Sequence, residues 1–467
     1  MSRLKSVAIA ILILSAQVAF SATASDVDAP LSHRLASLRD RLKAGDHVAL
    51  ETFWKEMVEK GTPLVEPIKG DSRHVLVTFL WRANSETKNV LLFSYALTFP
   101  DAVGIQQGQL ARLADTDVWF KTFTLRRDTH LTYVFSPNDS LVPEEMQRRL
   151  ANVQADPLNP RRGYGLESPQ ASMLELPGLP APRWTEKRAN VPQGKVEEHR
   201  LKSTLLNNER GIRVYTPPGY KSSGSRYDLL ILFDGQFYTN EIPAPTVLDN
   251  LIADKATPPI VAVMIDNIDG LSRLRELHCN ETFTEFLAKE LMPWVRRHYH
   301  VTADPHRTVI GGTSAGGLAA AFAALRHPEL FGNVLSNSGS LSWKPGLLDR
   351  YVSPDKPSPF DNGRYADFGW IIRQFAEQRK LPLRFYLDAG LMEDLAPRKP
   401  IQAGDTSQAG DLSGLVANRY LRDVLRAKGY EVNYYEFNGG HSDPRFQTLA
   451  NGLLALIGTG GIRANTR

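Results

Sequence analysis

The tightest constraint on this chain is a serine at the junction of a short apolar strand and an alanine-rich helix. The strand is predicted at 308–311, the helix at 315–325, and the junction reads Gly312-Thr313-Ser314-Ala315-Gly316. A strand-to-helix turn of this kind, a nucleophile elbow, strains the backbone and exposes the serine hydroxyl above the edge of a sheet. The flanking glycines allow neighbouring chain to approach closely. The motif predicts that Ser314 is a nucleophile on a parallel sheet.

The sequence around the elbow alternates strands with helices, as a parallel sheet requires. We predict strands at 212–216, 229–233, 260–265, 308–311, 333–338, 383–388 and 432–437, and helices at 283–298, 315–325 and 418–428. Such alternation is typical of a mostly parallel sheet with helices on both faces. The fold class is therefore α/β, and we place this catalytic domain at residues 195–467.

A serine hydroxyl becomes a good nucleophile only when a base takes its proton. In this fold the base is a histidine that follows the last strand. His441 fits, because it follows the strand at 432–437 and the turn Asn438-Gly439-Gly440. We therefore predict that His441 is the catalytic base.

The acid that orients the histidine should follow the strand before the last helix. Glu393 and Asp394 both follow the strand at 383–388. We favour Glu393 and keep Asp394 as the alternative. Asp388 lies too close to the strand, and Asp443 comes only two residues after the histidine.

Backbone N–H groups are expected to stabilise the oxyanion of an acyl-transfer reaction. One donor should be Ala315, the residue after the serine. The other should come from the loop after the strand at 229–233, where Gly235 or Gln236 can point its N–H inward.

The N-terminal half differs from the catalytic part. Apolar residues at helical spacing predict a helix at 26–60, and aromatic or alternating runs predict strands at 75–81, 89–95, 119–125 and 131–135. Short strands with little helix indicate a small β-sandwich, which we place at 25–155 with the helix. Seven prolines between 156 and 194 predict an extended linker there, because proline cannot donate to a sheet.

The first residues predict an export signal. Arg3 and Lys5 precede an apolar run at 7–14, and Ala22-Thr23-Ala24 forms a small-residue cleavage site. The run is short for a membrane span. We predict a signal peptide at 1–24 and a periplasmic destination in a bacterium, with an uncleaved anchor as the alternative.

Composition excludes several classes of protein. The 467 residues are 42% hydrophobic and 23% charged, which excludes a collagen-like or wholly disordered chain. The net charge of +4 is scattered, so nucleic acid is not an expected partner. The single cysteine, Cys279, excludes an intrachain disulfide, and it is either a reactive thiol or, as we favour, a small buried hydrophobe. No His/carboxylate cluster indicates a metal, so no cofactor is expected.

Several phrases resemble one family, the ferric enterobactin (enterochelin) esterases. In the C-terminal part these are the elbow at Ser314, Leu232-Phe233-Asp234-Gly235-Gln236-Phe237, Arg275-Glu276-Leu277-His278-Cys279-Asn280, Leu335-Ser336-Asn337-Ser338-Gly339-Ser340 with Trp343, and Gly439-Gly440-His441. In the N-terminal part they are Val77-Thr78-Phe79-Leu80-Trp81-Arg82, Asp115-Thr116-Asp117-Val118-Trp119 and Ala155-Asp156-Pro157-Leu158-Asn159-Pro160. The resemblance covers nearly the whole mature chain.

The resemblance implies an α/β-hydrolase domain behind a small immunoglobulin-like β-sandwich domain. It also implies cleavage of the ester bonds of a catecholate trilactone siderophore, with iron entering only as part of that substrate. The chain departs from the family in two features. The familiar two-domain enzyme works in the cytoplasm, whereas this chain carries a predicted export signal. The family often has aspartate directly after the histidine, whereas Ser442 intervenes here before Asp443.

Ferric tris-catecholate is anionic and aromatic, and arginines and aromatic rings suit it. We predict substrate contacts at Arg275, then Arg273, then Trp343. Two other functions stay open: an esterase for other phenolic or acyl esters, such as feruloyl esters, and a non-catalytic periplasmic siderophore-binding protein. The phrase from Arg275 to Asn280 and the N-terminal domain disfavour the first, and intact Ser314 and His441 disfavour the second. The sequence leaves the oligomeric state open.

Overall fold

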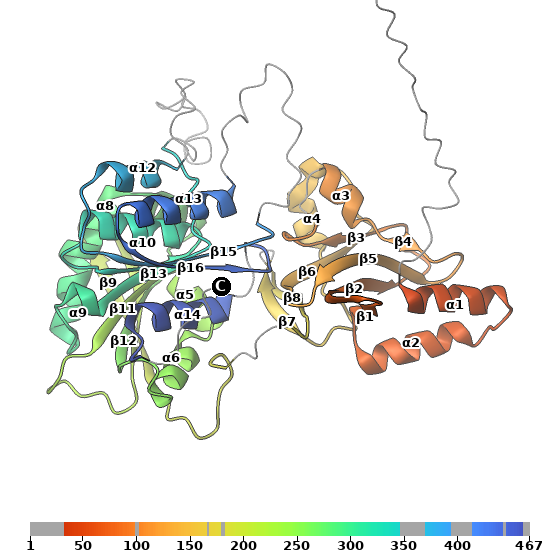
Figure 1. Cartoon of the computed structure of the whole chain (residues 1–467), viewed down its shortest axis with the longest axis horizontal. Coiled ribbons are helices and arrows are strands. Elements are labelled where there is room, and N and C mark those ends of the chain that lie inside the picture. Colours follow the sequence, from red (N-terminus) through yellow and green to blue (C-terminus); the bar gives the residue numbers. More distant parts are fainter. Residues whose placement is uncertain are drawn as a thin grey trace, which may run out of the picture.

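The computed structural model describes residues 32–98, 102–165, 168–178, 183–345, 369–393, 413–441 and 445–460. Figure 1 shows two folded parts side by side, an N-terminal β-rich domain and a C-terminal domain of strands and helices. Within these described ranges, no helix is both long and apolar enough to cross a membrane.

The N-terminal domain is a β-sandwich. One sheet has the order β1-β2-β5-β4, from Leu64–Ile68, Asp71–Arg82, Val118–Arg126 and Ala111–Arg112. The other has the order β3-β6-β8-β7, from Val90–Phe93, His130–Pro137, Ser168–Glu175 and Arg162–Gly165. The inward-facing side chains of both sheets form one apolar core that contains Phe79, Leu92 and Phe135. The predicted sandwich is therefore present, and its immunoglobulin-like character stays a prediction.

Short helices complete this domain. They are α1 (His33–Lys43), α2 (Ala49–Lys60), α3 (Ala102–Gly108), the 3₁₀ turn η1 (Pro143–Glu145) and α4 (Met146–Asn152). The single helix predicted at 26–60 is wrong in its described part, because the chain turns through Gly45, at φ +87°, between α1 and α2. Phe53 and Trp54 of α2 pack with Leu80 and Phe120 in a second apolar cluster.

The linker predicted at 156–194 is wrong over its first half. Strand β8 pairs with β6, with Leu174 opposite Leu131 and Ser172 opposite Tyr133. Most prolines of the segment lie outside this strand, and Pro169 precedes the residues of β8 that pair with β6, which are residues 172–175. The sandwich therefore extends at least to Glu175, and the domain boundary lies later than composition alone indicated.

The catalytic domain is built on an eight-stranded sheet of order β16-β15-β14-β13-β11-β12-β10-β9. The strands are β9 (Lys195–Ser203), β10 (Asn208–Thr216), β11 (Asp228–Phe233), β12 (Ile260–Ile265), β13 (Thr308–Thr313), β14 (Asn333–Asn337), β15 (Arg384–Gly390) and β16 (Glu431–Phe437). All pairs from β12 to β16 are parallel, and β10 is antiparallel to both of its neighbours. The predicted mostly parallel sheet is confirmed.

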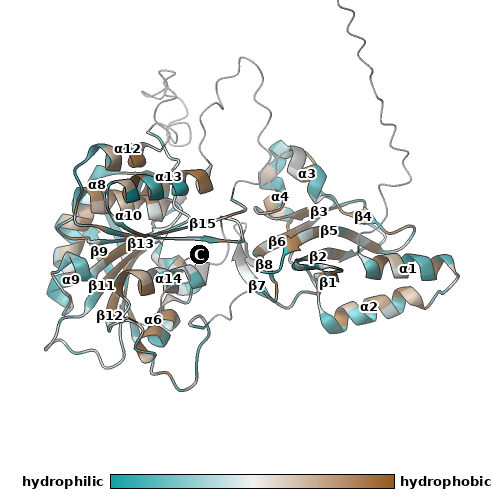
Figure 2. Cartoon of the chain, in the orientation of Figure 1, coloured by the Kyte–Doolittle hydropathy of each residue, from teal (hydrophilic) through white to brown (hydrophobic). Residues whose placement is uncertain are grey.

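Helices cover both faces of this sheet. They are α5 (Gly235–Asn240), α6 (Ala244–Ala253), α7 (Gly270–Leu277), α8 (Glu281–Phe286), the π-helical turn η2 (Leu287–Leu291), α9 (Met292–His298), the 3₁₀ turn η3 (Pro305–Arg307), α10 (Ala315–Arg326), α12 (Trp370–Glu377), α13 (Gly414–Ala427) and α14 (Arg445–Ile457). Residues of α8, α9, α10, α12 and α13 share one apolar core with the sheet, and residues of α6 and α14 share the other. The central strands β11, β12 and β13 are buried throughout, and Figure 2 shows the apolar colour of β11 and β12 beside helices of mixed colour.

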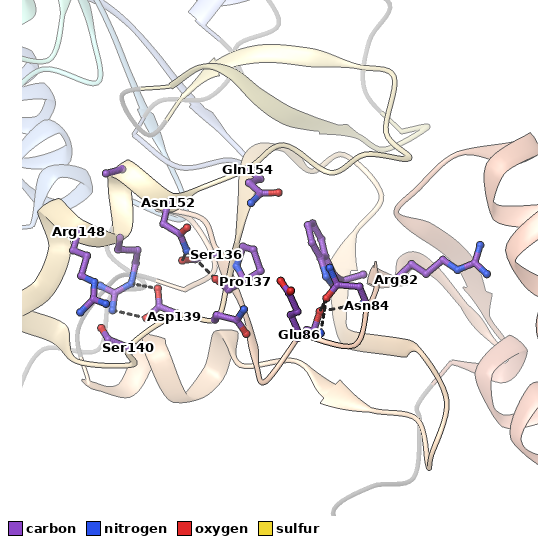
Figure 3. Close-up of a pocket in the computed structure, with 15 residues that line it drawn as sticks. Arg82, Asn84, Glu86, Ser136, Pro137, Asp139, Ser140, Arg148, Asn152 and Gln154 are labelled. Atoms are coloured by element: carbon purple, nitrogen blue, oxygen red, sulfur yellow. Dashed lines mark hydrogen bonds and ion pairs between the residues drawn. The ribbon is translucent and has the colours of Figure 1, made fainter.

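A hollow of about 490 Å³ lies where strands β2 and β6 of the sandwich end (Figure 3). Asn152 donates through Nδ2 to the carbonyl of Pro137 at 2.8 Å and to Ser136 Oγ at 3.4 Å. Buried Arg149 donates through Nε and Nη2 to the two carboxylate oxygens of Asp139, at 2.9 and 3.0 Å. These contacts hold α4 on the sheet, at the opposite end of β6 from the turn that precedes it.

A buried histidine at the start of β6 gives a pH-dependent stability. His130 is 5% exposed, and its Nε2 has no hydrogen-bond partner in the part of the chain that the structure describes; the nearby Glu175 Oε1 lies 3.9 Å away. Burial lowers the pKa of His130 to about 4. A histidine whose folded pKa is depressed contributes stability above its unfolded value, and this stability is lost as the pH falls from about 6.5 towards 4.

We expect His130→Gln to remove this loss. Between pH 7 and pH 5 the wild type should lose about 2 kcal/mol relative to the variant. Buried Asp388, whose pKa burial raises to about 8, titrates with the opposite sign. The difference between the two proteins, measured by urea unfolding at each pH, therefore isolates the histidine. Parallel curves for wild type and variant would contradict the assignment.

Candidate active site

The serine of the elbow stands between β13 and α10 in a strained backbone. Ser314 has φ +60° and ψ −119°, a conformation that costs about 1–3 kcal/mol unless its surroundings enforce it. They do so here: its N–H donates to Asn337 O at 2.9 Å, and its carbonyl accepts from the N–H of Ser340 at 3.0 Å. A Cβ at Gly312 would lie 2.9 Å from Gly316 Cα, so this turn requires glycine.

The predicted base and acid meet the serine in one hydrogen-bonded chain. His441 Nε2 lies 2.9 Å from Ser314 Oγ, and His441 Nδ1 lies 3.2 Å from Glu393 Oε2. A carboxylate only accepts, so Nδ1 carries the proton and Nε2 is left to accept from the serine hydroxyl. The three side chains come from the ends of β13, β15 and β16, which share one edge of the sheet.

Glu393 is held as a carboxylate. Its side chain is 2% exposed, and its second oxygen, Oε1, accepts from the N–H of Gly390 at 2.6 Å. Burial acts to raise the pKa of Glu393, but the hydrogen bond and charge of His441, with donors at Ser338 and Gly390, outweigh it and lower the pKa. Asp394 and Asp443 lie outside the described residues.

Asp388 has a different set of contacts. It is fully buried and accepts from Asn337 Nδ2 at 2.6 Å and from the N–H of Ser338 at 2.9 Å. These bonds tie the end of β15 to the end of β14. Ser340 is a contact that the sequence reasoning did not assign: its Oγ lies 3.1 Å from Ser314 Oγ.

The expected oxyanion donors begin two helices beside the serine. Ala315 is the first residue of α10, and Gly235 and Gln236 are the first two of α5. The N–H groups in the first turn of a helix have no partner within that helix. A Cβ at Gly235 would lie 2.7 Å from the Met264 carbonyl carbon, so only glycine fits this turn.

Arg273 holds the turn that carries Gly235 and Gln236. Its Nε and Nη2 donate to the two carboxylate oxygens of Asp234 at 2.6 and 2.9 Å. Asp234 is 6% exposed, has φ +58°, and also accepts from Asn267 Nδ2. We call residues 234–236, which carry the expected donors Gly235 and Gln236, the oxyanion loop. The structure thus gives Arg273, predicted as a substrate contact, a role in fixing this loop.

The two other predicted substrate contacts are placed differently. Arg275 lies on the same helix, α7, with an exposed side chain. Trp343 packs its ring 6.1 Å from that of His278 and 5.9 Å from that of Trp370, and its buried Nε1 has no hydrogen-bond partner among the described residues. The backbone N–H of Trp343 donates to the carbonyl of Ser340, the residue whose hydroxyl lies beside that of Ser314. The aromatic cluster is therefore linked to the site through Ser340. Substrate contact stays a prediction for both residues.

A pair of alanine variants should separate these two arginines. Arg273→Ala leaves a buried carboxylate without its strongest partner, so we expect a loss of about 2–3 kcal/mol in unfolding free energy. Arg275→Ala, its exposed neighbour, should stay within about 0.5 kcal/mol of wild type. Urea unfolding of both variants measures the difference. Equal stabilities would show that Arg273 does not lock the oxyanion loop.

Two further predictions from the sequence concern a metal site and the thiol of Cys279. Among the described residues, no group of three or more His, Cys, Asp or Glu side chains is arranged to hold a metal ion. Cys279 packs partly buried against the main core, and burial raises the pKa of its thiol, which disfavours the reactive thiolate.

A parallel sheet ending in a nucleophile elbow, with a histidine and a carboxylate in hydrogen-bonding reach of the serine, defines a serine hydrolase of the α/β-hydrolase fold. Residues 203–456 match the family described as Putative esterase. Residues 76–185 match the family described as Enterochelin esterase, N-terminal. The chain belongs to the enterochelin esterase family, and it is a carboxylic ester hydrolase.

Relatives and solved structures match over most of the chain. The iron(III) enterobactin esterase of Dickeya dadantii is 30% identical over 87% of this chain and 92% of its own length. The iron(III) salmochelin esterase of Escherichia coli O6:H1 is 28% identical over 77% and 86%. The crystal structure of the ferric enterobactin esterase of Salmonella typhimurium superposes with a TM-score of 0.70 at 27% identity, covering 87% of this chain and 98% of that one.

Proposed function

We propose that this protein hydrolyses the ester bonds of ferric or free catecholate trilactone siderophores such as enterobactin. The observation that carries the proposal is the Ser314–His441–Glu393 chain of hydrogen bonds. It lies in a two-domain protein whose relatives with this architecture are named iron(III) enterobactin and iron(III) salmochelin esterases. The reaction serves iron acquisition, because the opened trilactone binds iron less tightly than the intact ring.

The geometry supports the usual course of acyl transfer. His441 Nε2 takes the proton of Ser314 Oγ as this oxygen attacks an ester carbonyl carbon. The N–H groups of Ala315 and of Gly235 or Gln236 stabilise the tetrahedral oxyanion. His441 then returns the proton to the leaving alcohol, and an acyl-enzyme remains on Ser314. Water, activated by the same histidine, releases the acid and restores the serine.

The substrate's charge and rings suit the predicted contacts. A ferric tris-catecholate is anionic, and the exposed guanidinium of Arg275 can meet it from solvent. The ring of Trp343 offers a surface for a catechol. Arg275→Ala should therefore raise KM for the siderophore while its stability stays unchanged.

Product analysis tests the proposed substrate. Purified mature protein is mixed with ferric and with iron-free enterobactin, and the products are separated by chromatography. Linear trimer, dimer or monomer from the wild type, and none from Ser314→Ala, would support the proposal. Intact trilactone with hydrolysis of methyl ferulate would favour the phenolic-ester alternative. Intact trilactone with quenched tryptophan fluorescence and no ester hydrolysis would favour a binding protein.

We also propose that the reaction takes place in the periplasm. Arg3, Lys5, the apolar run at 7–14 and the small residues at 22–24 support export and cleavage. These residues lie outside the described ranges. N-terminal sequencing of the protein from the osmotic-shock fraction of a Gram-negative host should give a chain that starts at Ser25. Recovery of the uncleaved chain in the cytosol would overturn this location.

A further inference from the structure

One side chain of the catalytic domain lies inside the core of the sandwich. Met392 is 8% exposed and belongs to the apolar cluster formed by residues such as Val77, Leu92 and Leu174. Among the described residues, it is the single buried member of that cluster that the catalytic domain supplies. Met392 also directly precedes Glu393, so the carboxylate that meets His441 is attached to a residue packed in the other domain.

The loop that carries the histidine is held by the same domain. Asn438 Nδ2 donates to Thr129 Oγ1 at 2.7 Å and to Asp128 Oδ1 at 3.2 Å. The carbonyl of Asn438 accepts from the N–H of His130 at 3.2 Å. The turn Asp128–His130 of the sandwich therefore holds both the side-chain amide and the backbone carbonyl of Asn438, three residues before His441.

The two loops are also bonded to each other. The N–H of Leu391 donates to Phe437 O at 2.8 Å, and the N–H of Met392 donates to Gly439 O at 2.9 Å. The acid loop, residues 391–393, and the histidine loop, residues 438–441, are thus bonded to each other, and both contact the sandwich. Ser314, in contrast, takes its backbone bonds from Asn337 and Ser340 of the catalytic domain.

We propose that the N-terminal domain assembles the catalytic site: Met392 and Asn438 are positioning residues that dock the acid and histidine loops on the sandwich. The described backbone bonds of Ser314 all lie within the catalytic domain. The sandwich, in contrast, positions the loops that carry Glu393 and His441. The proposal rests on the catalytic roles given above to Glu393 and His441. It is independent of the siderophore, because any ester attacked by Ser314 needs the same base.

The test uses a small ester, p-nitrophenyl acetate, which reports on the triad without needing a large binding surface. A misplacement of about 1 Å in a catalytic group can cost about 100-fold in rate. We expect Met392→Ala and Asn438→Ala each to lower kcat about 10- to 100-fold with KM within about twofold. Met392→Leu, which keeps the apolar volume, should restore kcat to within about threefold of wild type.

Two control variants alter the same domain without changing a residue of the two loops. Leu92→Ala opens a cavity in the same core as Met392→Ala, since Leu92 is fully buried in that cluster. Asn152→Ala also removes an amide that donates to two acceptors, here a carbonyl and a hydroxyl, but it does so at the hollow beyond the other end of β6 (Figure 3). Assayed below their unfolding temperatures, both should keep kcat within about twofold of wild type.

A double-mutant cycle shows whether Met392 acts through the acid. In a Glu393→Gln background, Met392→Ala should cost less than about threefold, because the group it positions has already lost its function. A wild-type kcat for Met392→Ala and Asn438→Ala on p-nitrophenyl acetate, with a raised KM only for enterobactin, would overturn the proposal in favour of a simple substrate cap. If Met392→Ala fails to fold, Asn438→Ala and the leucine variant decide. Wild-type turnover of p-nitrophenyl acetate without turnover of enterobactin would refute the proposed substrate and leave this inference standing.

Discussion

Replacing Ser314 with alanine should lower kcat for ester hydrolysis by a factor on the order of 10⁴–10⁶. The variant loses the only atom that the reaction bonds covalently, while the N–H groups of Ala315, Gly235 and Gln236 stay in place. A residual rate above that in water is therefore expected, since oxyanion stabilisation and binding persist without the nucleophile. Alanine keeps the Cβ, so the backbone at φ +60° should remain as strained as before.

The measurement is kcat and KM on p-nitrophenyl acetate, with unfolding temperature as the check on folding. Ser340→Ala is the matched control, because its hydroxyl lies 3.1 Å from that of Ser314 and could in principle replace it. We expect that control to retain at least about a tenth of wild-type activity. A Ser314→Ala enzyme within tenfold of wild type would mean that another residue is the nucleophile.

The triad could be predicted from sequence because it depends on local patterns and strand order. Ser314, Glu393 and His441 each follow a recognisable apolar strand, and the carboxyl ends of neighbouring parallel strands share one edge. Chain order then assigned their roles. The sequence favours Glu393 over Asp394, and the contact of 3.2 Å between His441 Nδ1 and Glu393 Oε2 supports that choice.

The contacts that the sequence did not predict all join segments that are far apart. The sequence predicts Arg273 as a substrate contact, but it does not predict the ion pair of Arg273 with Asp234, 39 residues away. Met392 and Asn438 bind to another domain, and Asn438 and Asp128 lie 310 residues apart. Strand β8 was hidden for the same reason: local proline content indicated a linker, whereas pairing with β6 is a tertiary event.

The second large effect is expected at the acid. Glu393→Gln should lower kcat by about 10³- to 10⁴-fold with little change in KM. The reason lies in the two bonds of the carboxylate. Oε1 accepts from the N–H of Gly390 at 2.6 Å, so the amide oxygen of glutamine will stay there. The amide NH₂ then faces His441 Nδ1, which must become the acceptor, and the ring proton moves to Nε2.

That tautomer directs an N–H at Ser314 Oγ and cannot take its proton, so the histidine is present but ineffective as a base. The control is Asp394→Asn, which removes the carboxylate that the sequence analysis keeps as the alternative acid. Its kcat should remain within about threefold of wild type. Both variants are compared on p-nitrophenyl acetate at pH 7, where the lowered pKa of Glu393 keeps the native carboxylate ionised. If Asp394→Asn lost the activity while Glu393→Gln kept it, the bond between Glu393 and His441 would be structural, and Asp394 would be the acid that orients the base.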